Sequence, residues 1–176
     1  MAWLVDLIRE FGFGIVFLNV LIEQLGAPIP AYPVLVITGA LEGASITRLL
    51  ILVGIAVFAA LIADVIWYRA GKAYGGAVLG RICRISLSPD ACIRQTESVY
   101  GRWGPKSLLI AKFVPGFASI ASALAGTVGT PLSTFVLFDT LGALIWVGSA
   151  VFLGSLFSST VQDLLGHADV KTTMIY

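Results

Sequence analysis

Residues 111–126, AKFVPGFASIASALAG, are apolar enough to lie in a membrane, yet Lys112 stands ahead of a helix-breaking pair, Pro115-Gly116. Proline removes a backbone donor and blocks continuation of a helix. Because lipid supplies no replacement hydrogen bonds, broken backbone at membrane depth is tolerated only inside protein or against a wet cavity. The stretch is therefore predicted to form a re-entrant hairpin, which enters the membrane and returns to the same side.

The composition of the whole chain is that of a membrane protein. Its 176 residues are 58% hydrophobic and 12% charged, with a mean hydropathy of +0.96, whereas about 25% of the residues of globular proteins are charged. We therefore expect an integral membrane protein. The net charge of +1 gives no reason to expect nucleic-acid binding.

Two of the apolar stretches have the ~20 residues that a simple membrane span requires. Another opens with prolines at positions 28 and 30, and it is predicted to be a second re-entrant hairpin. The expected fold is an all-α membrane protein with two re-entrant helical hairpins and transmembrane helices. The five stretches are Phe11–Leu25, Pro28–Leu41, Leu49–Trp67, Ser107–Gly126 and Leu132–Phe157, of which the third and the fifth have the length of a span.

Basic residues cluster between the two predicted spans, and this cluster sets the expected orientation. By the positive-inside rule, loop 69–106 is predicted to be cytoplasmic. A hairpin and a span then recur in opposite orientation, which is the layout of an inverted repeat with a substrate site near the midplane. Seven of the eleven Lys and Arg residues belong to the cluster: Arg69, Lys72, Arg81, Arg84, Arg94, Arg102 and Lys106.

The cytoplasmic loop has two further expected features. A helix is predicted from Pro89 to about Tyr100, with a stop at Gly101, covering the cytoplasmic end of the protein. Cys83 and Cys92 are expected to be reduced thiols, because cytosolic disulfides are rare.

Four ionisable residues lie in or beside the apolar stretches: Glu23, Asp64, Lys112 and Asp139. A charge at the bilayer centre costs at least ~2.5–3.5 kcal/mol, so such groups usually face a cavity or a partner. Glu23 and Lys112 each precede a break, and they could pair or flank a polar cavity if the hairpin entrances converge. Alternatively, Lys112 snorkels to the headgroups. Asp64 is interpreted as a helix-end residue near the interface, and Asp139 as the better functional candidate of the two aspartates.

Three motifs on these breaks together resemble the DedA family of VTT-domain proteins, over roughly Phe11–Phe157. The resemblance implies two re-entrant hairpins, movement of phospholipids or polyprenyl phosphate between leaflets, and proton coupling in several members. It also marks Pro28, Pro30, Pro115 and Gly116 as site residues. The motifs are E-x4-P-x-P at Glu23 to Pro30, D-x-x-W-Y-x-x-G-[KR] at Asp64 to Lys72, and [RK]-F-x-P-G with a later G-A-x-x-W at Lys112 to Trp146.

The chain departs from the family pattern at three positions. Ala31-Tyr32 follows Pro30 where relatives carry an acid, and Ala118 stands where they carry an arginine. Asp139 stands where the family usually has asparagine. We interpret the absent acid and base as partners of each other, because the loss of only one would strand a buried charge.

The last residues differ in character from the rest, which divides the chain into a DedA-like membrane domain, 1–158, and a tail, 159–176. Residues 160–176 resemble the C-terminal segment of tyrosine recombinases, with His167 and Tyr176 in the places of its histidine and nucleophile. The remaining recombinase residues are missing from the sequence, so recombination is not expected. The tail is interpreted as a foreign fusion or, alternatively, as a native amphipathic segment.

The expected function is an inner-membrane translocase for a phospholipid or polyprenyl phosphate. Coupling of this transport to protons and assembly into a homo-oligomer are further expectations. In this hypothesis Lys112 attracts a phosphate and Glu23 handles a proton. The alternative is a non-catalytic scaffold or assembly factor. No enzyme, catalytic residue, metal or cofactor is expected, because the membrane part has no histidine and no paired carboxylates at ligand spacing.

Overall fold

A computed structural model describes residues 2–43, 45–84, 89–114 and 117–157, which fold into helices joined by turns. The expected all-α fold is thereby confirmed for this part of the chain. The helices, in order, are α1 (Ala2–Gln24), α2 (Ala31–Glu42), α3 (Ile46–Tyr74), α4 (Gly76–Cys83), α5 (Pro89–Trp103), the 3₁₀ helix η1 (Gly104–Ser107), α6 (Leu108–Ala111), α7 (Phe117–Thr127) and α8 (Leu132–Leu156).

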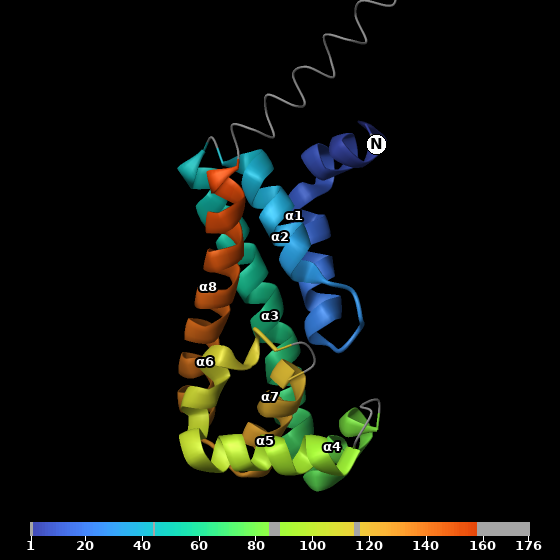
Figure 1. The fold of residues 1–176 in the computed structure, drawn as a ribbon, viewed down its shortest axis with the longest axis vertical. Coiled ribbons are helices and arrows are strands. Elements are labelled where there is room, and N and C mark those ends of the chain that lie inside the picture. The colour runs from blue at the N-terminus through green and yellow to red at the C-terminus, as the bar shows by residue number, and fades with distance from the viewer. Residues whose placement is uncertain (1, 44, 85–88, 115–116, 158–176) are drawn as a thin grey trace, which may run out of the picture.

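Two long helices, α3 and α8, run in opposite directions along the molecule (Figure 1). Both are long and apolar enough to cross a membrane. Helix α8 matches its predicted stretch closely. Helix α3 is longer than the predicted Leu49–Trp67, because backbone hydrogen bonds continue past the apolar residues as far as Gly75. The helix ends at Gly75, which has a positive φ of 56° that glycine adopts without steric cost.

Most of the shorter helices form two hairpins that approach from opposite ends, while α4 and α5 lie outside them (Figure 1). In one, α1 leads to a turn at residues 25–30 and α2 returns; in the other, η1 and α6 lead to residues 112–116 and α7 returns. Figure 1 places both turns about half-way along the long helices. The first turn contains Pro28 and Pro30 and a Gly26 with φ 108°. The second contains Pro115 and Gly116, which lie outside the described residues.

Each returning helix packs on the long helix of the other half: α2 on α8, and α7 on α3. Glycines make the close approach possible. A Cβ at Gly126 of α7 would lie 2.0 Å from the Tyr68 carbonyl oxygen of α3, and one at Gly71 of α3 would lie 1.8 Å from the Ala123 oxygen. Tyr32 of α2 also forms a hydrogen bond with Ser149 of α8 at 3.2 Å.

The buried apolar residues form two separate clusters, one toward each end of the molecule. On α3, the first cluster reaches Ala60 and the second resumes at Tyr68; on α8, one ends at Phe135 and the other begins at Ala143. Each long helix therefore has a gap between two apolar cores, and the buried aspartates described below fall in those gaps.

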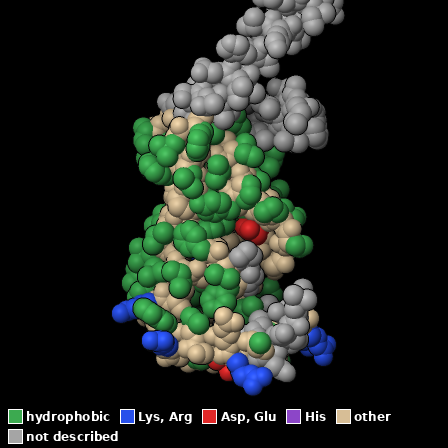
Figure 2. Space-filling view, in the orientation of Figure 1, with side chains coloured by type: hydrophobic (Ala, Val, Ile, Leu, Met, Phe, Trp, Pro, Cys, Tyr) green, Lys and Arg blue, Asp and Glu red, His purple; other side chains and the backbone are tan. Residues whose placement is uncertain are grey.

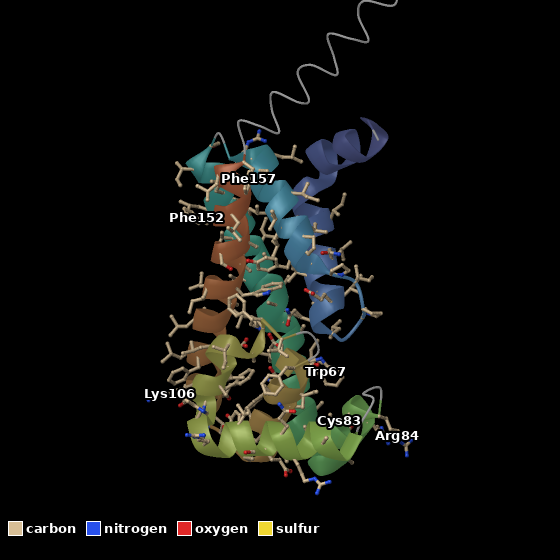
Figure 3. The ribbon with its side chains drawn as sticks, viewed as in Figure 1. Trp67, Cys83, Arg84, Lys106, Phe152 and Phe157 are labelled. Atoms are coloured by element: carbon tan, nitrogen blue, oxygen red, sulfur yellow. The ribbon has the colours of Figure 1, made fainter. Side chains whose placement is uncertain are left out.

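The lower end of the molecule, as Figure 2 is drawn, is polar. Lys and Arg side chains gather there, while hydrophobic side chains cover the flanks. Figure 3 places Lys106 and Arg84 at this end and Phe152 and Phe157 at the other. Helix α5 crosses this end and continues to Trp103, beyond the predicted stop at Gly101, until Gly104 adopts a φ of 56°.

Two other expectations concern this end and the tail. Cys83 is disulfide-bonded, which contradicts the expectation of reduced thiols. That expectation followed from the assumed cytosolic compartment, whereas a disulfide depends on which cysteines the fold brings within bonding distance. The expected foreign or amphipathic tail, 159–176, lies outside the described residues.

Candidate functional site: a buried ionic centre

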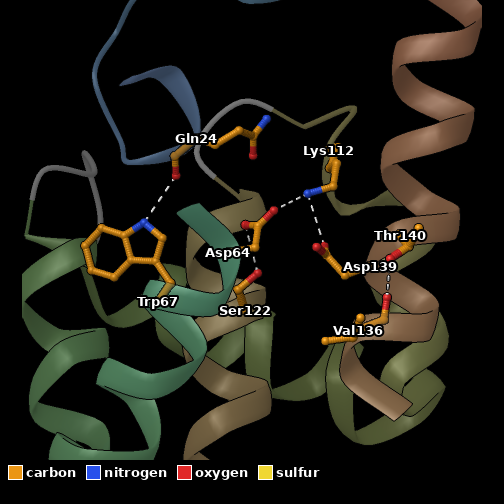
Figure 4. Close-up of polar contacts among 8 residues, drawn as sticks. All are labelled: Gln24, Asp64, Trp67, Lys112, Ser122, Val136, Asp139 and Thr140. Atoms are coloured by element: carbon orange, nitrogen blue, oxygen red, sulfur yellow. Dashed lines mark hydrogen bonds and ion pairs between the residues drawn. The ribbon is translucent and has the colours of Figure 1, made fainter. Parts of the chain in front are cut away.

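Lys112 lies at the C-cap of α6, directly before the break in the second hairpin. Its side chain is buried, with 6% of the residue exposed, and its ammonium contacts two carboxylates. One is Asp64, through Oδ2; the other is Asp139, through Oδ1 at 3.1 Å (Figure 4). The snorkelling alternative is therefore wrong, because the lysine finds its counter-charges inside the protein.

Asp64 lies within α3, well before the helix ends at Tyr74, and it is fully buried. Besides Lys112, it accepts a hydrogen bond from the Ser122 hydroxyl of α7 at 3.1 Å. Both of its oxygens are thus engaged. The interpretation of Asp64 as a helix-end residue near the interface is wrong, because α3 extends beyond the apolar stretch that suggested it.

Asp139 lies in α8, facing the same lysine, and 2% of its surface is exposed. Its second oxygen, Oδ2, has no hydrogen-bond partner among the residues that the structure describes. Lys112 therefore links the second hairpin to both long helices. Taken with the gaps between the apolar cores, this arrangement makes a charged layer across the middle of the protein.

Glu23 lies one residue before the end of α1 and does not bond to Lys112. Its carboxylate accepts a hydrogen bond from the backbone N–H of Ala31, the first residue of α2. It also interacts electrostatically with the positive charge of Lys112. An acid at a helix N-terminus is favourably placed for the unsatisfied N–H groups and the helix dipole. Of the two expected arrangements, pairing is absent, and Glu23 Oε2 has no partner.

Two residues of this region, Ser122 and Gln24, were not proposed as site residues from the sequence, and Trp67 was noted only within its motif and as an aromatic residue of the membrane interface. Ser122 positions Asp64, but it is one small residue among many in α7. Trp67 donates from Nε1 to the Gln24 carbonyl oxygen at 3.2 Å, joining α3 to the end of α1. Gln24 itself is 5% exposed, and its Oε1 has no partner. The D-x-x-W spacing placed Trp67 one turn from Asp64, which was the available signal.

Helix α5 is attached near this site. The Tyr68 hydroxyl of α3 donates to the Thr130 carbonyl oxygen, and Tyr100 of α5 shares a 2.8 Å hydrogen bond with the Thr130 hydroxyl. Burial raises the pKa of Tyr100, so its hydroxyl remains protonated at ordinary pH. These contacts tie α5 to the turn between α7 and α8.

Within the described residues, no group of three or more His, Cys, Asp or Glu side chains could hold a metal ion. The charged groups that the structure describes here are the Lys112 ammonium and the carboxylates of Asp64, Asp139 and Glu23. Such an arrangement can hold or exchange protons and can bind a charged headgroup, because buried ionisable groups in membrane proteins line ion or substrate pathways.

The fold and the ionic centre together define a helical membrane protein with a charged layer between two apolar cores. The VTT-domain profile matches residues 29–156, and the chain therefore belongs to the VTT-domain, or DedA, family. The family expected from the sequence motifs is confirmed.

Individual relatives support this assignment. The chain is 28% identical over 164 residues to an uncharacterized membrane protein of Synechocystis, covering 91% of this chain and 74% of that protein. It is 27% identical over 172 residues to the protein DedA of Escherichia coli, covering 92% and 78%. It is 24% identical over 178 residues to an alkaline phosphatase-like protein of Lactococcus lactis, covering 98% and 83%. No solved structure matches the chain at a significant level.

Proposed function

We propose that this protein moves a phospholipid or a polyprenyl phosphate between the leaflets of a bacterial inner membrane. The observation that carries the proposal is the buried centre of Asp64, Lys112 and Asp139, which lies between two helices that can span a bilayer. A charged group at that depth is costly, and such groups usually mark a substrate or ion pathway. Replacing a buried ion pair by well-packed apolar residues is often neutral or stabilising, so a purely structural core does not require these charges.

The hairpins are proposed to be re-entrant, each entering from one membrane face and turning near the midplane. Their helices support this: α2 and α7 are apolar but short, and ~20 residues are needed to cross. The second turn begins at Lys112, whose side chain belongs to the ionic centre, and broken backbone at membrane depth is accommodated beside protein or a wet cavity.

An inverted repeat is likewise proposed, and the glycine contacts support it. The contacts between α7 and α3 are reciprocal. Gly126 of α7 faces the backbone of Tyr68, about one turn before Gly71 of α3, and Gly71 faces the backbone of Ala123, about one turn before Gly126. In α2 and α8, Gly39 and Gly154 are related in the same way. The sequence separation between proline and glycine is also the same in the two hairpins, from Pro28 to Gly39 and from Pro115 to Gly126. Two halves with equivalent crossings are what an internal repeat produces.

Lys112 is the proposed contact for the phosphate. The structure adds a condition for phosphate binding that the sequence did not suggest. Its ammonium is already engaged by two carboxylates, so a phosphate must compete with at least one of them. Neutralising one carboxylate with a proton would make the lysine available. Proton coupling then follows from the arrangement of charges.

The test is leaflet exchange in vesicles of bacterial phospholipid, with a fluorescent phospholipid in one arm and a labelled polyprenyl phosphate in the other. We expect faster exchange of at least one probe with the protein than in empty vesicles. Lys112→Met should abolish the increase, whereas Lys106→Met, which removes an exposed lysine, should preserve it. Equal exchange of both probes with and without the protein would rule out the proposal.

Two further arms examine the remaining expectations. A chain ending at Phe157 should exchange lipid as well as the full chain if the tail is foreign to the function. If the protein is instead a scaffold, neither probe will move and Lys112→Met will leave cellular phenotypes unchanged. We also propose a non-enzymatic role, which release of phosphate from a phosphomonoester by the purified protein would contradict.

A further inference from the structure

Among the residues that the structure describes, the ionic centre contains one more carboxylate than its single ammonium can neutralise. Lys112 contacts Asp64 and Asp139, and all three side chains are almost completely buried. A buried excess charge is expensive in a medium of low dielectric constant. The centre as built therefore calls for one additional positive charge.

The two aspartates are not equivalent. Asp64 accepts from Ser122 at Oδ1 and from Lys112 at Oδ2, so both oxygens have donors. Hydrogen bonds to a carboxylate stabilise its charged form. Within the described residues, Asp139 accepts from Lys112 at Oδ1, and its Oδ2 has no hydrogen-bond partner. Only 2% of the residue is exposed.

Gln24 supplies a second, independent sign that the centre lacks donors. It is 5% exposed and its Oε1 has no hydrogen-bond partner. In Figure 4 its side chain extends from α1 toward the Asp64–Lys112 pair. Buried acceptors without donors are uncommon in folded proteins, so a donor belongs in this region.

We propose that Asp139 is the exchangeable proton site of this protein, with the proton on Oδ2, and that Asp64 is the fixed counter-ion of Lys112. The step is a simple binding of H⁺ by the Asp139 carboxylate to give the carboxylic acid, and its reversal on the other side of the membrane. The assignment differs from the sequence expectation that Glu23 handles the proton. The assignment rests on the proposed function only for the use of the proton, which is to drive lipid movement.

The charged groups around Asp139 are those of the ionic centre itself. Of the groups on the described elements packed against α8, Asp64 and Lys112 face Asp139. Other polar groups on these elements have partners of their own or are exposed. Tyr32 bonds to Ser149, Glu42 forms an ion pair with Arg48, and Lys106 is exposed.

A proton on Asp139 would change the partners of Lys112. The ammonium would keep Asp64, with which it forms a neutral pair, and would lose the charge attraction of Asp139. Because Asp139 belongs to α8 and Asp64 to α3, protonation loosens the link to one long helix only. The freed side of Lys112 is where a phosphate would bind under the proposed function.

The experiment is carboxyl ¹³C NMR of the purified full chain in nanodiscs, labelled at the γ-carbon of aspartate and titrated with pH. Asp139→Glu and Asp64→Glu assign the two buried signals, since each removes one aspartate signal and keeps an acid. We expect the Asp139 signal to titrate and the Asp64 signal to stay at the ionised position. Thr140→Val, a neighbouring hydroxyl bonded to the Val136 oxygen of its own helix, should leave both unchanged.

Titration of Asp64 instead, or of neither aspartate, would overturn the assignment. The readout requires no transport, so it separates the proton site from the proposed function: a titrating Asp139 in a protein that moves no lipid supports the site and removes the function. In vesicles that do exchange lipid, Asp139→Asn should flatten the dependence of the rate on pH. An unchanged pH dependence in that variant would contradict the proposal.

Discussion

Lys112 joins groups that the chain places far apart. Asp64 comes from α3, Asp139 from α8, and the lysine from the end of α6. Its methylene chain is buried with its charge, so the residue cannot be exchanged for a neutral one without leaving two carboxylates unmatched. The lysine is therefore both a structural link and the charge on which the proposed transport depends.

Lys112→Met should destabilise the protein by about 3–5 kcal/mol, the usual effect of removing one partner from a buried ion pair. Thermal unfolding in detergent measures the loss. Additional Asp64→Asn and Asp139→Asn changes should restore much of the stability, because no unpaired charge is left. Lys106→Met is the control at an exposed site. A Lys112→Met variant as stable as the wild type would show that the centre holds no buried ion pair.

Among the elements, the returning helices α2 and α7 are held by backbone-to-backbone approach at glycines. Four of these, Gly39, Gly71, Gly126 and Gly154, would bring a Cβ within 3 Å of the facing helix. By contrast, a Cβ added at Gly54 of α3 or at Gly148 of α8 would meet nothing within 4 Å. The difference separates glycines that are required for packing from glycines that are not.

Gly71→Ala should push α7 away from α3, because the new methyl group would lie 1.8 Å from the Ala123 oxygen, which is backbone and cannot turn aside. We expect a loss of about 1–3 kcal/mol or more, as for overpacking, together with loss of lipid exchange. Gly54→Ala, in the same helix, should be neutral or slightly stabilising. Thermal unfolding of the two variants side by side measures the difference, and equal stabilities would contradict the close packing.

At the scale of the whole molecule, polarity is distributed by level. Apolar side chains cover the flanks and basic side chains gather at the α4–α5 end (Figure 2), while Asp64, Lys112 and Asp139 are buried inside the protein. Arg48 and Glu42 form an exposed ion pair at 3.1 Å near the start of α3. This distribution is that of a protein with two water-facing ends and a lipid-facing middle.

The α4–α5 end should face the cytoplasm. A membrane-impermeant amine reagent, followed by mass spectrometry, is expected to modify Lys72 and Lys106 in inverted membrane vesicles and not in intact cells. Both lysines are exposed in the structure. Lys112, which is buried, should remain unmodified from either side. Labelling of Lys72 and Lys106 in intact cells would reverse the assigned orientation.

The helical class, the two spans and the positions of the breaks could be predicted from the chain, because each depends on local properties: hydropathy, length and the missing N–H of proline. The prolines at 28 and 30 lie in the predicted turn. Partnerships could not be predicted in the same way. Asp64 was misassigned because it lies near the end of an apolar run, although the helix continues for several turns.

Residue type and order alone established the family, the membrane character and the four buried or half-buried charged residues that matter. Which of those charges meet depended on the packing of the helices. Lys112 bonds to Asp64 and Asp139 and not to Glu23, and Ser122 completes the site. The reason is that α7 packs on α3 and α6 on α8, and no local pattern specifies which face of one helix meets another.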